Sequence, residues 1–314
     1  MTRNDFETLF EQLVSHLSGK QKKLNIPSVL PVYYGISAEG YRRLAFLSVS
    51  RPPKIESTRI LRVTQGKEDD DIYWTCFDLL SDKAKTVYYS FCSNLVQSVI
   101  NAETEAQGLA SLKNRFIIWK ALFTSESSTN VSTDILRGLY GELYFLNNYL
   151  LNKYESTKTV LSWSGPDSTS KDFSLDEVWY EVKTIGSNES TVKISSITQL
   201  TSNAIGFLTV IKAEQMSSEY SGENCCISDL IDSILVKLAD EHLESILLNK
   251  VSAYCENSYD AFSTVRFNVN SVKIFRVESG FPRITIDEVP YSAITNVSYE
   301  IAIAALEHFL EEKL

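Results

Sequence analysis

Apolar residues in the first part of the chain follow two spacings, one typical of strands and one typical of helices. Runs rich in β-branched and aromatic residues lie between Pro and Gly turns, and they predict strands at 29–34, 44–49, 59–63 and 72–79. Apolar positions three and four residues apart predict helices at 5–17, 88–100 and 109–123. Together these elements predict one α+β domain over residues 1–124.

A second pattern follows residues 125–133, which are rich in Ser, Thr and Asn and predict a linker. Ser132, Thr133 or Asp134 can cap a helix at 133–151. The later spacing predicts a strand at 159–163, a hairpin at 170–184, a short helix at 195–202, a buried strand at 206–212, a long amphipathic helix at 228–248 and strands from about 264. We therefore expect a second α/β (α+β) domain over residues 125–314.

The composition is that of an ordinary folded chain. With 314 residues, 44% of them hydrophobic, the chain is long enough for two domains with normal cores. Its five cysteines are odd in number and lack a CxxC spacing, which argues against a disulfide framework or a zinc site. Without a charged and apolar leader or an apolar run near the ~20 residues of a membrane helix, we expect a cytoplasmic protein with no membrane partner.

Charge is distributed unevenly along the chain. The whole chain has 30 Lys+Arg and 40 Asp+Glu, and residues 1–66 hold 10 of the basic and 5 of the acidic residues. The remaining residues therefore carry 20 basic and 35 acidic side chains. Such asymmetry can mark a face that contacts nucleic acid, although an ordinary solvated surface explains it equally well. The candidate contacts are Lys20, Lys22, Lys23, Arg42, Arg43, Arg51 and Lys54.

The hairpin at 170–184 carries the most informative group of charges. Side chains alternate along a strand, so Glu181 and Lys183 point to one face while Val182 points to the other. If a four-residue loop at 174–177 joins the two strands, Asp172 lies opposite Trp179, on the face of Glu181 and diagonal to it. Diagonal neighbours lie ~7–8 Å apart, which suits two carboxylates that bind one metal ion. A register shifted by one residue would place Asp172 on the opposite face.

These three side chains fit the chemistry of phosphodiester cleavage. Mg²⁺ prefers carboxylate oxygens, and it can activate water and stabilise developing charge. Lys183 would orient the water or stabilise the transition state. The bare pattern Glu-x-Lys is weak evidence, because Glu311-Glu312-Lys313 repeats it on what the pattern predicts to be a terminal helix. The apolar strand, the partnering Asp and a Glu-bearing helix upstream favour the first occurrence.

Several short motifs resemble the PD-(D/E)xK nuclease superfamily, and in particular an uncharacterised bacterial family encoded in restriction-modification and phage-defence gene clusters. The motifs are Gly138-Leu139-Tyr140-Gly141-Glu142-Leu143, Trp163-Ser164-Gly165-Pro166, Lys171-Asp172-Phe173 and Glu181-Val182-Lys183-Thr184, with weaker likeness at Val32-Tyr33-Tyr34-Gly35 and Phe281-Pro282-Arg283-Ile284. The resemblance implies a restriction-endonuclease-like core, with a mixed central sheet flanked by helices and preceded by a smaller α+β N-terminal domain. It also implies DNA as substrate and Mg²⁺ as cofactor, with Mn²⁺ as an alternative ion.

The resemblance also assigns roles to individual residues. Asp172, Glu181 and Glu142 would bind the metal, and Lys183 would complete the catalytic set. Glu142 can equally be a solvated helix residue. The literal Pro-Asp pair ends at Asp167, but we prefer Asp172 because it lies in the hairpin. Gln199 matches a glutamine that related nucleases often use, while a plain surface role is equally plausible.

Two functions of different classes follow. The first is a Mg²⁺-dependent DNA endonuclease of a bacterial restriction or phage-defence system, working with other subunits or as a homo-oligomer. The second is a non-catalytic DNA-binding or assembly subunit that keeps the nuclease fold. The complete Asp/Glu/Lys set favours the enzyme. A small-molecule hydrolase finds no support, because the chain has no P-loop, GxSxG or G-x-G-x-x-G motif.

Overall fold

The chain forms two compact units. The computed structural model describes residues 1–14, 19–68, 71–123, 131–167, 170–238, 240–254, 261–289, 293–294 and 296–314. The first unit comprises residues 1–130 and 247–260, and the second comprises 131–246 and 261–314. Residues 247–260 therefore belong to the first unit, although they lie within the predicted second domain. The end of the first predicted helix and most of the predicted linker lie outside the described residues.

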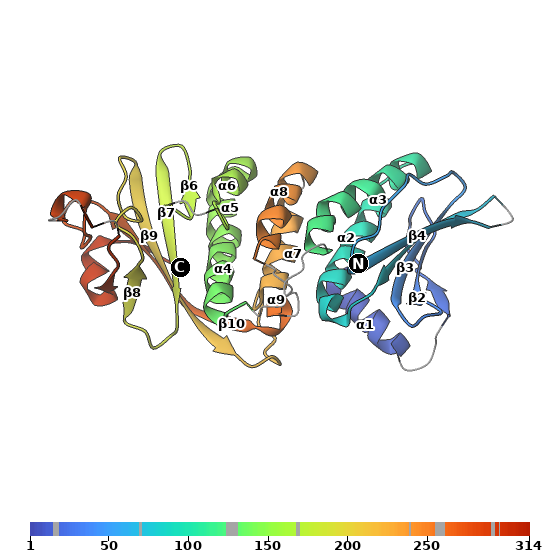
Figure 1. Ribbon diagram of the computed structural model, residues 1–314, viewed down its shortest axis with the longest axis horizontal. Coiled ribbons are helices and arrows are strands. Elements are labelled where there is room, and N and C mark those ends of the chain that lie inside the picture. The colour runs from blue at the N-terminus through green and yellow to red at the C-terminus, as the bar shows by residue number, and fades with distance from the viewer. Residues whose placement is uncertain are drawn as a thin grey trace. The chain divides into compact units, whose positions relative to one another are not determined.

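The first unit is an antiparallel sheet with helices on one face (Figure 1). Its sheet has the order β1-β2-β3-β5-β4, with strands β1 (Gln21–Lys23), β2 (Val32–Ile36), β3 (Arg42–Ser48), β4 (Leu61–Lys67) and β5 (Tyr73–Leu79). The helical elements are α1 (Arg3–Val14), η1 (Asp82–Ala84), α2 (Lys85–Ile100), α3 (Glu105–Lys120) and η2 (Ala121–Phe123). Aromatic rings join the two layers: Phe77 of β5 lies 5.5 Å from Phe91 and 6.0 Å from Phe116, measured between ring centroids.

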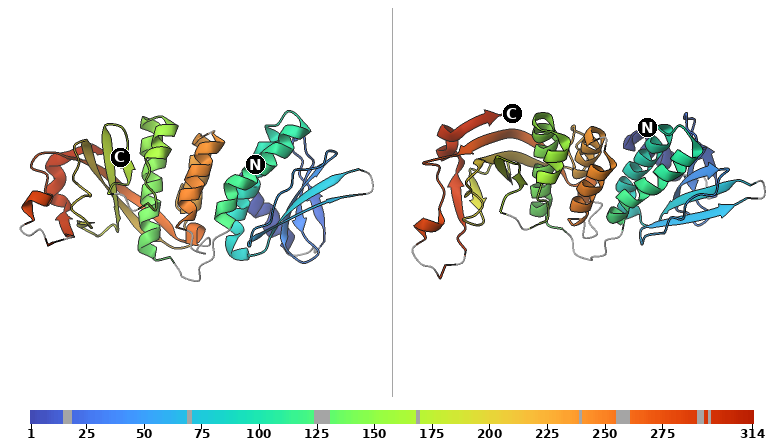
Figure 2. Two further views of the ribbon diagram at one scale, coloured as in Figure 1. Left: turned by 45° about the horizontal axis from the view of Figure 1, so that its top comes forward. Right: turned by 90° about the horizontal axis from the view of Figure 1, so that it is seen from above.

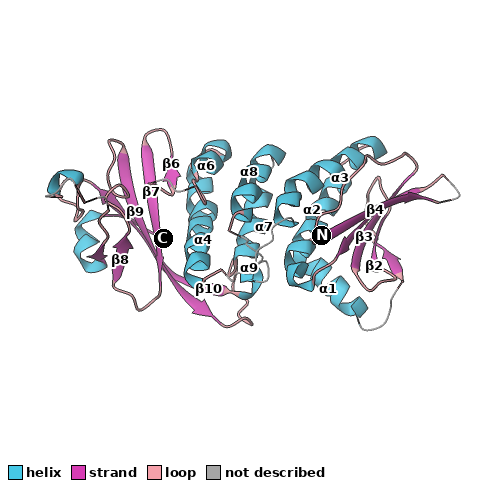
Figure 3. Cartoon of the chain, in the orientation of Figure 1, coloured by secondary structure: helices cyan, strands magenta, loops and turns pink. Residues whose placement is uncertain are grey.

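The second unit contains a mixed sheet of five strands in the order β12-β10-β9-β7-β6 (Figure 3). Strands β7 (Val178–Ile185) and β9 (Ile205–Met216) are parallel, whereas β6 (Phe173–Ser174), β10 (Arg266–Val277) and β12 (Leu310–Lys313) pair antiparallel with their neighbours. Helix α4 (Thr133–Phe145) lies against one face of this sheet, and α7 (Ile227–Leu238) packs on α4 (Figure 2). The remaining helical elements are the π-helical turn η3 (Leu146–Leu150), α5 (Leu151–Lys153), α6 (Ser156–Ser162), α8 (Glu241–Ser252), α9 (Ala261–Thr264) and η4 (Ile286–Glu288).

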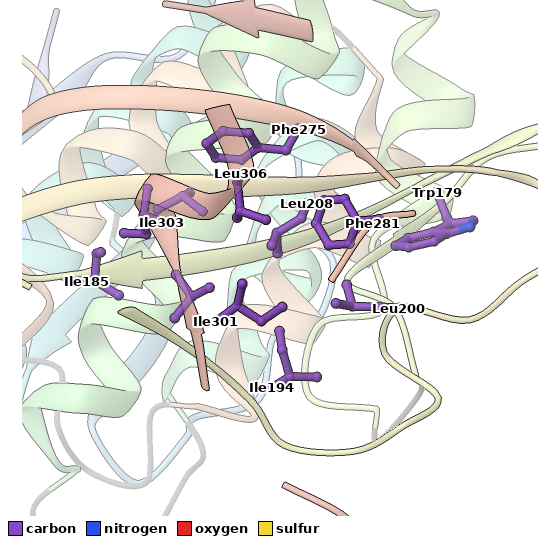
Figure 4. Packing of buried hydrophobic residues seen from close by; sticks show 12 residues of the cluster. Trp179, Ile185, Ile194, Leu200, Leu208, Phe275, Phe281, Ile301, Ile303 and Leu306 are labelled. Carbon is purple, nitrogen blue, oxygen red and sulfur yellow. The ribbon is translucent and has the colours of Figure 1, made fainter. Parts of the chain in front are cut away.

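The other face of the mixed sheet is covered by a small sheet and a 3-10 helix. Strand β8 (Thr191–Ile194) pairs with β11 (Tyr299–Ala302), and η5 (Ile303–Phe309) follows directly. Buried side chains of these elements meet Leu208 and Phe275 of the main sheet in one apolar cluster (Figure 4). Trp179 and Ile185 of β7 belong to the same cluster. Glu181 and Lys183 lie between these two residues along the strand, so they share the face that carries this core.

The predicted fold class is confirmed: the second unit has a mixed central sheet flanked by helices, and the first is a smaller α+β unit. The predicted helix at 133–151 continues as α4, η3 and α5, and Ser132 caps it by accepting a hydrogen bond from Ile135 N at 3.3 Å. No helix in the described part of the chain is long and apolar enough to cross a membrane.

Two predicted elements have the wrong type. Residues 159–162 of the predicted strand at 159–163 belong to helix α6, and only Trp163, which follows the helix, has extended backbone. Within the helix, Thr159 and Val160 are fully buried, and this packing overrides the β propensity of the run. The predicted terminal helix around Glu311 is the strand β12, which pairs with β10.

Two further predicted helices differ from the structure. Residues 197–200 form turns in place of the predicted helix at 195–202. The long helix predicted at 228–248 is divided into α7 and α8. Asp240 causes this break, because its Oδ1 accepts a hydrogen bond from His242 N at 2.8 Å and starts a new helix.

Candidate active site

Strand β7 presents Glu181 and Lys183 side by side on one face. Glu181 is only 1% exposed, and Lys183 Nζ lies 2.8 Å from Glu181 Oε1. A carboxylate in such surroundings needs a partner, because burying an unpaired charge is costly. Lys183 supplies one, so these residues form an ion pair within the protein core.

The hairpin brings Asp172 to the neighbourhood of Glu181. Phe173 pairs with Tyr180 and Ser174 with Trp179, and Asp172 lies in a bend just before the paired residues. The strands leave residues 175–177 between them, where residues 174–177 were predicted, and Leu175 N donates to Val178 O across this loop at 2.9 Å. Phe173 therefore pairs with Tyr180 and not with Val178, which corrects the predicted register by two positions. Asp172 Oδ2 also accepts a hydrogen bond from Val182 N at 2.7 Å.

Helix α4 brings Glu142 toward the same carboxylates. A Cβ atom on the neighbouring Gly141 would lie 1.7 Å from Thr184 Oγ1, so glycine is what allows the helix to approach β7 this closely. Glu142 Oε2 accepts a hydrogen bond from Trp163 Nε1 at 2.7 Å. Trp163 is fully buried and forms a β-bridge with Phe173, so it links Glu142 to the strand that follows Asp172.

Burial raises the pKa of all three carboxyl groups, and repulsion by neighbouring carboxylates adds to this effect for Glu142 and Glu181. Burial is the main cause for Glu142, whose pKa lies well above its usual range, and the charge of Asp172 raises it further. Burial likewise raises the pKa of Asp172, against the hydrogen bond from Val182 N and the charge of Lys183. For Glu181, burial and then the charge of Asp172 raise the pKa to about 8, although Lys183 opposes both effects. Simultaneous ionisation of the three carboxyl groups is therefore unfavourable unless a further positive charge, such as a cation, binds next to them.

The carboxyl oxygens of Glu142, Asp172 and Glu181 are the type of donor atom that a hard divalent cation prefers. One oxygen of each carboxyl group has a hydrogen-bond or ion-pair partner: Trp163 for Glu142, Val182 N for Asp172 and Lys183 for Glu181. Within the described residues, no three His, Cys, Asp or Glu side chains form a ready group for a metal ion. A cation would nevertheless relieve the repulsion that the raised pKa values express, and carboxylate oxygens are ligands that Mg²⁺ prefers. The residues therefore fit the ion in chemical type.

The other two candidate residues, Asp167 and Gln199, do not place their side chains among these carboxyl groups. Asp167 is exposed in a turn in which its N donates to Ser164 O at 3.3 Å, whereas Asp172 is the aspartate whose carboxylate binds Val182 N next to Glu181. The side chain of Gln199 accepts a hydrogen bond from Ser195 N at 2.7 Å, within its own turn. Its link to the carboxylates is indirect and runs through its main-chain oxygen, which accepts a hydrogen bond from Lys171 Nζ at 2.8 Å.

Two residues at this site were not predicted from the sequence. Trp163 belongs to the motif Trp163-Ser164-Gly165-Pro166, but only the fold shows that its indole N–H donates a hydrogen bond to Glu142. Lys171 precedes Asp172 and is 7% exposed, with Nζ 4.3 Å from the centroid of a ring of Trp179. Burial lowers the pKa of Lys171 to about 8, against the raising effect of Glu181. A lysine next to the motif aspartate is the signal that could have indicated it.

The basic residues of the first unit are of two kinds. Arg42 pairs with Asp82, and Arg43 Nε lies 2.6 Å from Asp78 Oδ1, so both side chains neutralise acids of their own unit. In contrast, Lys20 and the two lysines of β1, Lys22 and Lys23, are exposed. Arg51 and Lys54 are at the surface as well, with Lys54 3.5 Å from Glu56.

A mixed sheet flanked by helices, with this hairpin in the sheet and α4 on one face, is consistent with a restriction-endonuclease-like α/β fold. Residues 4–304 match the model of the DUF4420 family, which is described as "Putative PD-(D/E)XK family member". The chain belongs to this family, and the predicted membership of the PD-(D/E)xK superfamily is confirmed. Neither the curated proteins nor the solved structures contain a match to the chain.

Proposed function

We propose that the protein is a Mg²⁺-dependent DNA endonuclease that hydrolyses phosphodiester bonds. The observation that carries the proposal is the ion pair of Glu181 with Lys183, next to Val182, whose N donates to Asp172 Oδ2. Glu142 adds a third carboxyl group from α4. Family membership supports the nuclease class, and the substrate, the ion and the reaction are the proposed parts.

Each residue has a role that its position supports. Asp172, Glu181 and Glu142 would bind Mg²⁺, or Mn²⁺ in its place. When bound, the ion supplies positive charge for the scissile phosphate and lowers the pKa of a water molecule. Lys183 places its side-chain nitrogen beside Glu181, from which it would stabilise negative charge that develops on the phosphate. The indole N–H of Trp163 binds one oxygen of Glu142, and this hydrogen bond fixes the orientation of the whole carboxyl group.

The biological setting is a further part of the proposal. We place the enzyme in a bacterial restriction or phage-defence system, where it would act in the cytoplasm with other subunits or as a homo-oligomer. The resemblance of the motifs at 138–143, 163–166, 171–173 and 181–184 supports this setting.

A plasmid cleavage assay tests the activity directly. Supercoiled plasmid is incubated with the full chain in Mg²⁺, Mn²⁺, Ca²⁺ or EDTA, alone and with the products of neighbouring genes. We expect nicked and linear DNA with Mg²⁺ and Mn²⁺ and intact plasmid with EDTA. Asp172→Asn should remove the activity, while Asp167→Asn, a change at the exposed aspartate of the same segment, should retain it. Intact plasmid under all conditions would reject the proposal.

The rival function is a non-catalytic DNA-binding or assembly subunit. It is favoured by the burial of the acids: Glu181 is 1% exposed, and one oxygen of each acid already has a partner within the chain. This function predicts DNA retention in a mobility-shift assay without cleavage, and the same retention by Asp172→Asn. Cleavage that depends on Asp172 excludes it.

A further inference from the structure

Lys171 makes an unusual set of contacts for a residue next to a candidate metal ligand. Its buried ammonium donates hydrogen bonds to three main-chain carbonyl oxygens: those of Thr198, Gln199 at 2.8 Å and Thr201 at 3.2 Å. A lysine ammonium has three N–H donors, and here each donor has a carbonyl acceptor. The side chain therefore joins the segment before β6 to the turn that precedes β9.

The same turn is held by two other residues. Arg283 Nη1 donates to Leu200 O at 2.6 Å, so the four successive carbonyl groups from Thr198 to Thr201 are all bound by cationic side chains. Trp179, whose ring lies under the Lys171 ammonium, donates from Nε1 to Ala204 O at 3.3 Å. These contacts form a fixed support, because Trp179 is in the buried cluster of the unit.

The sheet holds the segment that carries Asp172 by few contacts: the pairing of β6 with β7, the β-bridge of Phe173 with Trp163 and the hydrogen bond from Val182 N to Asp172 Oδ2. Strand β6 has only two residues, Phe173 and Ser174, and it lies at the edge of the sheet. Asp172 itself lies just outside that strand, where its O accepts a hydrogen bond from Ser164 N at 2.8 Å. Ser164 Oγ donates to Lys171 O at 2.7 Å. On the side of the segment that faces the turn, the support comes from the Lys171 side chain.

We propose that Lys171 is a positioning residue of the site: by binding the carbonyl groups of residues 198, 199 and 201, it fixes the main chain at Asp172, whose carboxylate binds Val182 N next to Glu181. The inference deepens the proposed function and rests on it for the role of Asp172. A purely structural lysine would stabilise the fold without acting on the carboxylates, and this difference can be measured.

The test compares three variants of the full chain with the unchanged protein. Lys171→Met keeps the length of the stem and removes every donor. Lys171→Arg keeps the charge, but its planar donors cannot converge on three carbonyl groups in the same way. Lys158→Met is the matched control, because Lys158 is exposed and pairs with Asp176 in the loop of the same hairpin, at 2.7 Å.

Two measurements are made without DNA. Hydrogen exchange follows the amides of residues 171–174 and 197–205, and Tb³⁺ luminescence excited through tryptophan follows metal binding beside Trp163. In Lys171→Met we expect exchange in both segments to be about 10-fold faster or more, because charge-assisted hydrogen bonds are lost. In the same variant we expect the affinity for Tb³⁺ to fall about 10-fold. The exchange rates and Tb³⁺ affinity of Lys171→Arg should lie between those of Lys171→Met and the unchanged protein, and those of Lys158→Met should equal those of the unchanged protein.

The outcomes separate this inference from the proposed function. Unchanged exchange at 171–174 together with unchanged Tb³⁺ affinity in Lys171→Met overturns the positioning role, whatever the activity. Faster exchange at 197–205 alone shows a structural tether and also overturns it. If Lys171→Met does not fold, the same two measurements on Lys171→Arg are compared with those on the unchanged protein, and the same outcomes support or overturn the positioning role. If the predicted changes occur but no DNA is cut, the positioning role stands and the proposed reaction fails.

Discussion

At the scale of single residues, the pairing of Lys183 with Glu181 is the feature most open to test. Lys183→Ala should lower the rate of DNA cleavage by about 10²–10³-fold, because it removes one electrostatic stabiliser of the transition state. DNA binding should change little, since the interaction acts mainly in the transition state. Turnover and KM on a plasmid substrate check this prediction.

The control for Lys183→Ala is Lys193→Ala, at an exposed lysine of β8 in the same unit. It should leave cleavage unchanged. A Lys183 variant that folds and cuts DNA at the full rate would show that the amine has no part in the chemistry.

The raised pKa of Glu181 has a consequence for the stability of the metal-free protein. Its folded-state pKa of about 8 lies above the ordinary 4.5 that unfolding restores. The folded state therefore holds the proton more tightly, and this contribution to the free energy of unfolding is complete below about pH 4.5 and is lost as the pH rises through 8. In EDTA, we expect the unfolding free energy to fall by on the order of 1–3 kcal/mol between pH 5 and 8 from this group.

Glu181→Gln isolates that contribution. The amide cannot ionise, so the variant should lose less stability than the unchanged protein over the same pH interval, as measured by urea unfolding in EDTA. Identical pH dependence in the two proteins would mean that Glu181 ionises normally in the folded state.

At the scale of elements, the contact of α4 with β7 depends on one glycine. Gly141→Ala would place a methyl group 1.7 Å from Thr184 Oγ1, so the helix must move away from the strand. We expect the unfolding free energy to fall by about 1–3 kcal/mol, the usual range for overpacking a core. The displaced helix should also weaken Tb³⁺ binding, because Glu142 moves with it.

Gly138→Ala is a matched control on the same helix. A Cβ atom at Gly138 meets nothing within 4 Å, so this substitution brings only the helix propensity of alanine. It should raise the unfolding free energy by about 0.5–1 kcal/mol. Equal effects of the two substitutions in chemical denaturation would contradict the tight contact at Gly141.

Alternation of side chains explains how much of the site the sequence could predict. The face shared by Glu181 and Lys183 follows from a period of two along β7. The register of the hairpin could not be predicted, because it depends on which residues close the turn, and neither could the hydrogen bond from Val182 N to Asp172 Oδ2. Propensity also failed at 159–162, where the burial of Thr159 and Val160 in α6 outweighs the preference of these residues for a strand.

Contacts between segments that are distant in the sequence could not be predicted from the spacing of residue types. Lys171 is bonded to carbonyl groups some thirty residues later, and no local spacing encodes such a contact. The same holds for Trp163 with Glu142, which requires the packing of α4 near the strand after Asp172. The fold class could be predicted because it rests on element types and order, and the supporting contacts could not because they rest on tertiary packing.

At the scale of the whole molecule, the uneven charge leads to a prediction about DNA affinity. Changing Lys20, Lys22 and Lys23 to Glu should weaken binding and flatten its dependence on salt, since each lost phosphate contact removes about 0.9 from the slope of log affinity against log salt concentration. Binding isotherms on duplex DNA over a range of NaCl concentrations measure both quantities.

A triple change at exposed lysines elsewhere controls for net charge. The three control positions are Lys83, Lys113 and Lys193. The control variant should retain most of the affinity and the salt slope. Equal losses in the two triple variants would show that overall charge, and not the segment around β1, governs binding. Arg42 and Arg43 are left out of the test because their ion pairs with Asp82 and Asp78 make a fold defect the expected result.

The division of the chain into its two units constrains how such a gene could be rearranged. The first unit is discontinuous: residues 247–260 return to it after most of the second unit has been made, so the chain passes between the units at three places. A single recombination point near residue 130 would separate the first unit from one of its own segments. A ribosome must likewise reach residue 260 before the first unit has all of its parts.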